Sequence, residues 1–223
     1  MGCLCPRKKD SEKKNRLLSQ ENENNLHYEY VDKNKNKTED LDLSKYGNIE
    51  YDEDFAKKAL NKNNYYRELH GAKPLVLDEN LGKRACIIAK PVLLNQSYEN
   101  EELLTYGKNE ELGMIDLRSE EELSPEQLME KWYSEIEQYD FKEPKDFECM
   151  EFAQMIWKDS KKFGIGYYHL ENDMPLNISE DKESDMSNIK YVYVALYYPG
   201  GNKPGKYKDN IREPKTKKKE EEK

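Results

Sequence analysis

The first residues of the chain combine groups that can carry lipid attachment. Gly2 directly follows the initiator methionine, which is the acceptor position for N-myristoylation, and Cys3 and Cys5 are candidates for palmitoylation. Position 6 is Pro6, whereas the usual myristoylation pattern has Ser or Thr there. Because one acyl chain holds a protein at a membrane only marginally, stable anchoring needs a second acyl group or a basic patch.

A basic patch follows these acceptor residues at once: Arg7, Lys8, Lys9, Lys13, Lys14 and Arg16. Residues 1–20 carry a net charge of +4, residues 203–223 also carry +4, and residues 21–202 carry −17, within a total of −9. Basic ends suit an anionic membrane surface, whereas an acidic body argues against nucleic-acid binding. We therefore expect residues 1–20 to be an acylatable basic anchor, and no nucleic-acid partner.

The composition predicts one folded domain between unfolded ends. Charged residues make up 37% of the chain and hydrophobic residues 35%, which is too polar for a globule packed from end to end. We expect residues 21–50 to be a disordered polar tether, residues 51–202 to be the domain, and residues 203–223 to be a disordered charged tail. No apolar run suits a signal peptide, so we expect a cytoplasmic protein without structural disulfides.

Helices are expected in the first part of the domain and strands in the last. Asp52 can cap a helix over 53–70, Asp78 can cap a second that Pro91 ends or kinks, and Ser124 can cap a third. A short fourth helix is expected over 149–158. Two strands are expected over 163–168 and 190–198, separated by an acidic loop over 171–188. Helices ahead of paired antiparallel strands indicate an α+β fold.

One carboxylate lies where a helix should be apolar. The third helix presents Leu128, Trp132 and Ile136 on one side, and Glu135 falls on that same side. Burying a carboxylate is costly unless it is paired or hydrogen-bonded, so Glu135 is a candidate functional residue.

Four blocks of the chain match the motifs of one known family, in order and with similar spacing: Tyr66-Arg67-Glu68-Leu69-His70-Gly71-Ala72-Lys73-Pro74-Leu75, Lys131-Trp132-Tyr133-Ser134-Glu135-Ile136, Phe152-Ala153-Gln154-Met155-Ile156-Trp157-Lys158 with Lys161-Lys162-Phe163-Gly164-Ile165-Gly166, and Tyr191-Val192 through Tyr198-Pro199-Gly200-Gly201-Asn202. These blocks resemble the CAP superfamily of cysteine-rich secretory, antigen 5 and plant pathogenesis-related proteins. Within it, the chain is most similar to the intracellular, lipid-anchored, Golgi-associated branch. The resemblance implies a three-layer α-β-α sandwich with a central antiparallel sheet (the CAP or SCP fold), flanked here by disordered tails. It also implies membrane association, affinity for anionic lipids or sterols, and homodimer formation.

The resemblance also implies a cavity site, which this chain changes. Family members with an intact cavity place two histidines and two glutamates around it, a set that can hold a divalent metal. Glu110 and Glu135 match the two glutamates, whereas Glu151 stands at the position of one histidine, and residues 86–110 contain no histidine. Carboxylates without imidazole suit calcium or magnesium rather than zinc. We favour a degenerate site without a metal or other cofactor, with calcium or magnesium at the three glutamates as the alternative.

No catalytic group accompanies these carboxylates. The histidines, His27, His70 and His169, are interpreted as surface, packing or capping residues, and Cys149 has no histidine beside it in the sequence. We therefore expect a non-catalytic, lipid-anchored CAP-domain protein at a cytosolic membrane face, either of the Golgi or another endomembrane or of the plasma membrane, binding lipids or partner proteins. Two alternatives remain open. One is a cation-dependent hydrolase that uses the carboxylates, and the other is a soluble acidic scaffold that recruits basic partners.

Overall fold

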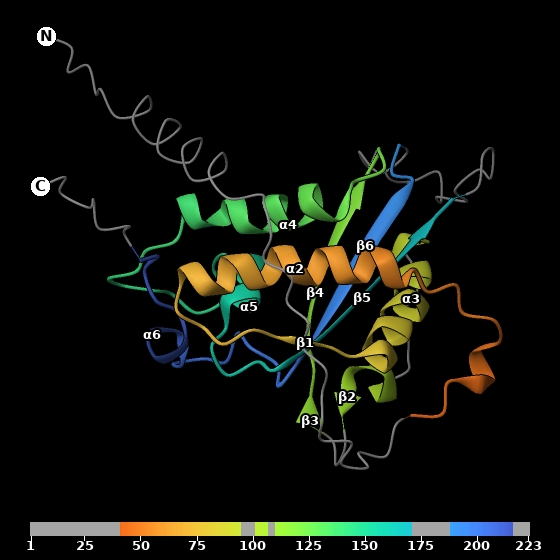
Figure 1. The fold of residues 1–223 in the computed structure, drawn as a ribbon, viewed down its shortest axis with the longest axis horizontal. Coiled ribbons are helices and arrows are strands. Elements are labelled where there is room, and N and C mark those ends of the chain that lie inside the picture. Colours follow the sequence, from red (N-terminus) through yellow and green to blue (C-terminus); the bar gives the residue numbers. More distant parts are fainter. Residues whose placement is uncertain (1–40, 95–100, 107–109, 171–187, 216–223) are drawn as a thin grey trace, which may run out of the picture. The chain divides into compact units, whose positions relative to one another are not determined.

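The computed structural model describes residues 41–94, 101–106, 110–170 and 188–215. Figure 1 shows the elements, whose bounds are η1 (Ser44–Tyr46), α2 (Glu53–Leu69), β1 (Val76–Leu77), α3 (Glu79–Leu93), η2 (Glu101–Leu104), β2 (Thr105–Tyr106), β3 (Glu110–Glu111), β4 (Gly113–Ser119), α4 (Pro125–Tyr133), η3 (Ser134–Glu137), α5 (Met150–Ile156), β5 (Lys162–His169), β6 (Tyr191–Tyr198) and α6 (Tyr207–Asn210). The expected mixture of helices and strands is confirmed.

The main sheet has the order β1-β5-β6-β4. The three long strands are antiparallel, with Ile165 opposite Ala195 between β5 and β6, and Ile115 opposite the same alanine between β4 and β6. The two-residue β1 joins the edge of β5 in parallel, and β2 and β3 form a separate hairpin. Both strands expected from the sequence are present, whereas β1 to β4 were not expected.

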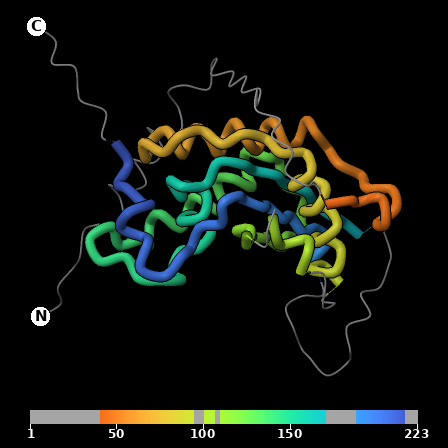
Figure 2. Tube along the Cα trace, turned by 90° about the horizontal axis from the view of Figure 1, so that it is seen from below, coloured from red at the N-terminus to blue at the C-terminus, as the bar shows by residue number. Residues whose placement is uncertain are grey.

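Alternation along the central strand builds two cores. In β6, Tyr193, Ala195 and Tyr197 face the apolar cluster that contains residues of α2, α4 and α5. Val192, Val194 and Leu196 face a second cluster, which α3 supplies. The sheet is therefore a middle layer with helices on both sides, as an α-β-α sandwich requires, and Figures 1 and 2 show these layers from two directions.

Two glycines of β5 allow α3 to lie directly on the sheet. A Cβ atom at Gly164 would lie 2.3 Å from the backbone nitrogen of Gly82, and one at Gly166 would lie 2.5 Å from that of Cys86. Both distances are too short for real atoms. The Phe-Gly-Ile-Gly sequence therefore places large side chains toward one core and leaves the opposite face open for the α3 backbone.

The predicted helix starts are confirmed by their hydrogen bonds. The side chains of Asp52 and Asp78 accept from the N–H groups of the third residue beyond each, and Ser124 forms a full capping box with Gln127. Pro91, which was expected to end or kink the second helix, does not end it, because α3 continues to Leu93 and Leu94 N–H still donates to Lys90 C=O at 3.0 Å.

One fully buried arginine ties α2 to the far part of the chain. The guanidinium of Arg67 donates to the carbonyl oxygens of Lys73 (2.8 Å) and Met155 (3.0 Å). It also donates to those of Trp157 (2.8 Å) and Ser160 (3.0 Å). No carboxylate neutralises it in these bonds, and burial lowers its pKa to about 10. The four carbonyls therefore replace the water that this cation would otherwise bind.

The expected limits of the folded domain are wrong at both ends. Leu43, placed in the tether, is buried in the α3 cluster. Tyr207 and Ile211, placed in the tail, are buried in the other cluster, and Lys215 N–H donates to Leu69 C=O at 2.8 Å. These apolar residues are isolated among charged ones, so the composition of each segment concealed them. Among the described residues, folded structure therefore begins before residue 51 and continues beyond residue 202.

Candidate functional site

Glu135 and Glu151 form a pair of carboxylates at the start of α5. The Glu135 carboxylate accepts from the backbone N–H groups of Glu151 (3.1 Å) and Phe152 (3.0 Å). Cys149, at the N-cap of this helix, makes no side-chain capping bond. Glu135 therefore caps α5 from another element, η3, which explains a carboxylate on an apolar side of the chain.

The two side chains also share a hydrogen bond. Burial, and after it the hydrogen bond to the Glu151 side chain, raises the pKa of Glu135 to about 7. The two bonds from backbone N–H groups act in the opposite direction and lower it. Two neighbouring carboxylates repel each other when both are charged, which favours a proton on Glu135 as the pH falls toward its pKa of about 7. The chemistry of the two side chains is that of a proton-sharing acid pair.

Glu110 does not complete a metal site with this pair. It lies on β3, is exposed, and accepts a hydrogen bond from the Tyr198 hydroxyl at the end of β6. Through this bond, Glu110 raises the pKa of Tyr198 to about 12. Within the part of the chain that the structure describes, no group of three or more His, Cys, Asp or Glu side chains could hold a metal ion. The expected set of three carboxylates therefore reduces to two.

A further acid near the pair was missed from the sequence. Asp116 lies on β4, and burial raises its pKa, with a smaller raising effect from the negative charge of Glu151 and a lowering effect from Arg118. β4 was not among the expected strands, and the available signal was the alternation of apolar and charged residues over Ile115, Asp116, Leu117 and Arg118.

The histidines have structural surroundings in the described residues. His70 is buried, with Nδ1 at hydrogen-bond distance from Arg212 C=O and Nε2 2.9 Å from the Tyr133 hydroxyl. Burial lowers its pKa. His169 is exposed at the end of β5 and stacks on Tyr191. His27 lies outside the described residues.

The candidate nucleophiles are not activated. Burial raises the pKa of the Cys149 thiol, and the charges of Glu135, Glu148 and Glu151 raise it further. Burial also raises the pKa of Cys86 to about 11. The Ser134 hydroxyl donates to Lys131 C=O at 2.7 Å. A thiolate or alkoxide is therefore disfavoured at all three positions.

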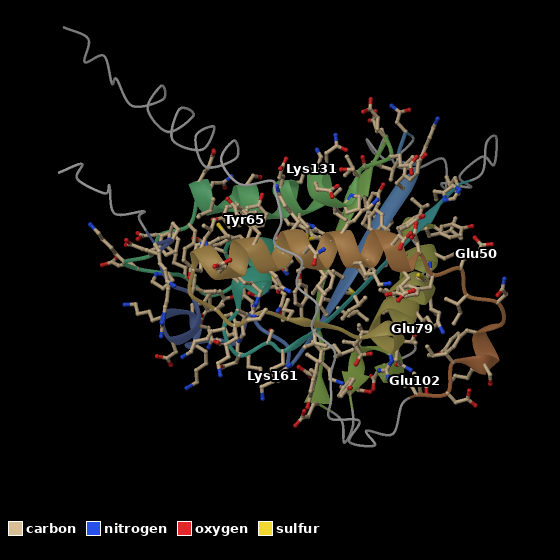
Figure 3. The ribbon with its side chains drawn as sticks, in the orientation of Figure 1. Glu50, Tyr65, Glu79, Glu102, Lys131 and Lys161 are labelled. Atoms are coloured by element: carbon tan, nitrogen blue, oxygen red, sulfur yellow. The ribbon has the colours of Figure 1, made fainter. Side chains whose placement is uncertain are left out.

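A groove of about 660 Å³ lies on the other side of the molecule, between residues 46–52, α3 and the end of β5. Its lining includes Tyr51, Cys86 and Tyr168, with the Lys90 ammonium 5.6 Å from the centre of the Tyr168 ring. Glu50 marks this side in Figure 3, well away from Tyr65 and Lys131 on α2 and α4. No pattern in the sequence indicated this groove.

The predicted anchor residues, namely Gly2, Cys3, Cys5 and the basic residues from Arg7 to Arg16, lie outside the described residues. Within the described residues, no helix is both long and apolar enough to cross a membrane.

Comparison with known proteins identifies the family. The model of the CAP (cysteine-rich secretory protein) family matches residues 60–179, more than half of the chain. Golgi-associated plant pathogenesis-related protein 1 of Homo sapiens is 30% identical over 168 residues, covering 72% of this chain and 94% of that protein. Among solved structures, Schistosoma mansoni venom allergen-like protein 4 is 20% identical, with a TM-score of 0.48, and the match covers 72% of this chain and 95% of that one. NaASP2 with Zn²⁺ is 22% identical, with a TM-score of 0.49, covering 74% and 88%. The family match and the identity with the human relative show that this chain belongs to the CAP family.

Proposed function

We propose that this chain is a lipid-anchored CAP-domain protein that works without catalysis at cytosolic membrane faces, through contacts with lipids and partner proteins. The observation that carries the proposal is the 30% identity with a relative named Golgi-associated, because the match spans 94% of that relative. A Golgi or other endomembrane face is the expected location, with the inner leaflet of the plasma membrane as the alternative.

The N-terminal residues supply the proposed means of attachment. Gly2 would carry myristate, and Cys3 or Cys5 would carry palmitate. The six basic residues from Arg7 to Arg16 would attract anionic lipids, each contributing about 1 kcal/mol close to the surface. One acyl chain together with such a patch is enough for stable anchoring. Anionic lipids are therefore the first partner class, with sterols and a second copy of the chain also proposed.

The absence of catalysis is supported by the contacts of the candidate groups. A covalent mechanism needs a nucleophile beside a base. The Cys149 thiol has a raised pKa, the Ser134 hydroxyl is bonded to a backbone carbonyl, and His70 is bonded to Tyr133 and Arg212. None of these groups is placed to activate another.

Metabolic labelling and fractionation test the anchor. Cells expressing the wild type would be fed a clickable myristate analogue and, separately, a palmitate analogue. We expect Gly2→Ala to lose myristate label, Cys3→Ser/Cys5→Ser to lose palmitate label, and both variants to shift from membranes to the cytosol. Ser11→Ala, a nearby substitution without an acceptor role, is the matched control. An unlabelled, cytosolic wild type would contradict the proposal.

The carboxylate pair supports a second candidate, a cation-dependent hydrolase. A glutamate with a pKa near 7 can exchange protons with a substrate at physiological pH, which general acid–base catalysis requires. Calorimetric titration of the wild type and of Glu135→Gln with calcium, magnesium and zinc tests its premise. Heat that the variant lacks would support this candidate, and no heat with any ion would remove it.

A further inference from the structure

β5 is paired along the whole of one edge and along only a part of the other. On the first edge, β6 pairs with β5 at every position from Lys162 to His169. On the second edge, β1 pairs in parallel with Lys162 and Phe163. Figure 1 shows β5 continuing past β1. Among the described residues, the second half of β5 therefore has no neighbouring strand on its outer edge.

The backbone groups of alternate residues point to this outer edge. Asp78 N–H donates to Phe163 C=O at 2.8 Å, so this carbonyl group points away from β6. In an antiparallel strand, residues two apart direct their backbone groups to the same side, so Tyr167 and His169 follow Phe163. Tyr167 N–H bonds to the Cys86 thiol. Within the described chain, no backbone N–H from outside the sheet donates to the carbonyl groups of Tyr167 and His169.

The groove of about 660 Å³ runs along this open edge. Its lining includes the consecutive residues Tyr167, Tyr168 and His169 of β5. Successive residues of a strand point to opposite faces of the sheet, and here Tyr167 packs on the α2-side cluster and Tyr168 on the α3-side cluster. A groove that reaches both faces of one strand passes around its edge, where the unpaired carbonyl groups lie.

An extended peptide fits a groove of this kind. A chain that lies beside β5 can donate its N–H groups to the unpaired carbonyls, and its side chains then alternate between the two faces of the sheet. A compact small molecule that fills the groove on one face leaves the other face and the edge carbonyls without a partner. The position of the groove around a strand edge therefore favours a peptide.

Charged groups on the two walls specify the side chains of that peptide. On the α3 side, the exposed Lys90 ammonium lies 5.6 Å from the centre of the Tyr168 ring. On the α2 side, Oδ2 of the exposed Asp52 carboxylate lies 3.4 Å from the Tyr167 hydroxyl. Neither charged group has a salt-bridge partner among the described residues. An acidic side chain on one face and a basic side chain on the other would complement these two charges.

We propose that this groove binds an extended peptide segment of a partner protein, which adds to the open edge of β5 as a further strand. The segment carries an acidic residue opposite Lys90 and a basic residue at the adjacent position, opposite Asp52. Main-chain hydrogen bonds supply affinity, and the two charged positions supply selectivity. This inference rests on the partner-protein part of the proposed function, to which it adds the place of contact and the chemistry of the partner.

A positional-scanning library of immobilised hexapeptides tests the charge pattern. The purified full chain without acyl groups would be applied to it, and we expect selection of an acid at one position and a base at the next. Lys90→Glu should reverse the first preference, with about a fivefold change in affinity for each charge. Asp52→Asn, which keeps an acceptor for the start of α2, should lose the second preference. The matched control is Lys58→Glu, the same charge change at an exposed position of α2 outside the groove lining, and it should keep the wild-type pattern.

Backbone methylation of the selected hexapeptide tests the addition of a strand. Each N-methyl group removes one hydrogen-bond donor, and only alternate residues of an added strand direct their N–H groups to β5. We expect methyl groups at these alternate positions to weaken binding by about tenfold, and methyl groups at the intervening positions to change it less than about twofold.

Three results overturn the proposal: no hexapeptide is selected, Lys90→Glu leaves the acid preference unchanged, or methylation weakens binding equally at all positions. A reversed preference cannot arise from a variant that fails to fold, so Lys90→Glu remains informative. Because the chain carries no acyl group and no membrane is present, a negative peptide result leaves the proposed anchor unaffected. A failed labelling result in cells equally leaves the peptide result unaffected.

Discussion

The two faces of the sheet are packed by different means. On the α3 side the buried residues of the cluster are aliphatic except for Tyr106, and contact depends on glycines that let backbones meet. On the α2, α4 and α5 side the cluster is rich in aromatic rings, and it surrounds buried polar side chains such as Asn64, Arg67, His70 and Gln154. On the α3 face, a substitution is therefore limited by the space available for a larger side chain. On the face with α2, α4 and α5, it is limited by the need to keep the buried polar groups hydrogen-bonded. The carboxylate pair lies on the second face, where polar groups are already bound by backbone amides.

Removal of Arg67 should give the largest effect. Arg67→Ala leaves the carbonyls of Met155, Trp157 and Ser160 buried without this donor and opens a cavity, so we expect a loss of about 4 kcal/mol or more in the free energy of unfolding. Urea denaturation followed by circular dichroism measures it. Arg67→Lys keeps the charge but cannot reach all four acceptors, so its free energy of unfolding should lie between those of the wild type and the alanine variant. A loss below about 1 kcal/mol for the alanine variant would contradict the described role.

Adding a methyl group on the α3 face of the sheet should destabilise the chain somewhat less than removing the Arg67 side chain. Gly164→Ala would place a Cβ atom 2.3 Å from the Gly82 nitrogen, which forces α3 away from the sheet. We expect a loss of about 2–3 kcal/mol in the same denaturation experiment. His169→Ala, at an exposed position of the same strand, is the control and should change stability little. Equal stabilities for the two variants would show that α3 can shift without cost.

The acid pair predicts a pH dependence confined to the polar face. The pKa of Glu135 is about 7 in the folded chain, against 4.5 for an ordinary glutamate. Between pH 4.5 and about pH 7, folded Glu135 therefore retains a proton that the unfolded side chain has released. The folded state thus binds more protons, and the free energy of unfolding falls as pH rises through this window. Glu135→Gln should remove about 1–2 kcal/mol of that fall between pH 5 and 8, as measured by denaturation across pH. Glu143→Gln, at an exposed position, should keep the wild-type slope.

A single helix cap should have the smallest effect. Ser124→Ala removes the side-chain acceptor for Gln127 N–H at the start of α4, and we expect a loss of about 1 kcal/mol. Thermal unfolding measures it, with Ser124→Asp as a control that restores an acceptor and most of the stability. A loss as large as that of Arg67→Ala would mean that α4 depends on its cap more than on its packing.

Local signals predicted three helix starts and two of the three long strands, β5 and β6. Asp52, Asp78 and Ser124 act through bonds that span three residues, so their neighbours in sequence are enough to recognise them. The packed segments at both ends of the domain were missed, because single apolar residues such as Leu43 and Tyr207 gain their partners only in the folded chain. β4 was missed because its edge position leaves it with a mixed polar and apolar sequence.

Three carboxylates were expected from the sequence to lie around one cavity. Two of them, Glu135 and Glu151, are neighbours in the structure. Glu135 was recognisable because its position on an apolar stripe required a partner, and the partner proved to be the start of α5. The place of Glu110 beside Tyr198 depended on the register of β3 and on the end of β6, which no local pattern encodes. The exposure of Phe147 was not expected either, because no local pattern shows which aromatic residues remain in solvent.

The position of β6 in the sheet has a consequence for how the chain acquires its structure. Among the described residues, β6 is the last strand in sequence, yet it lies between β5 and β4, and β4 pairs with no other described strand of the main sheet. During synthesis on the ribosome, neither neighbour can complete its pairing until residues beyond Tyr198 have been made. Nascent chains stopped before β6 should therefore expose strand edges and engage chaperones, whereas longer ones should fold as one cooperative unit.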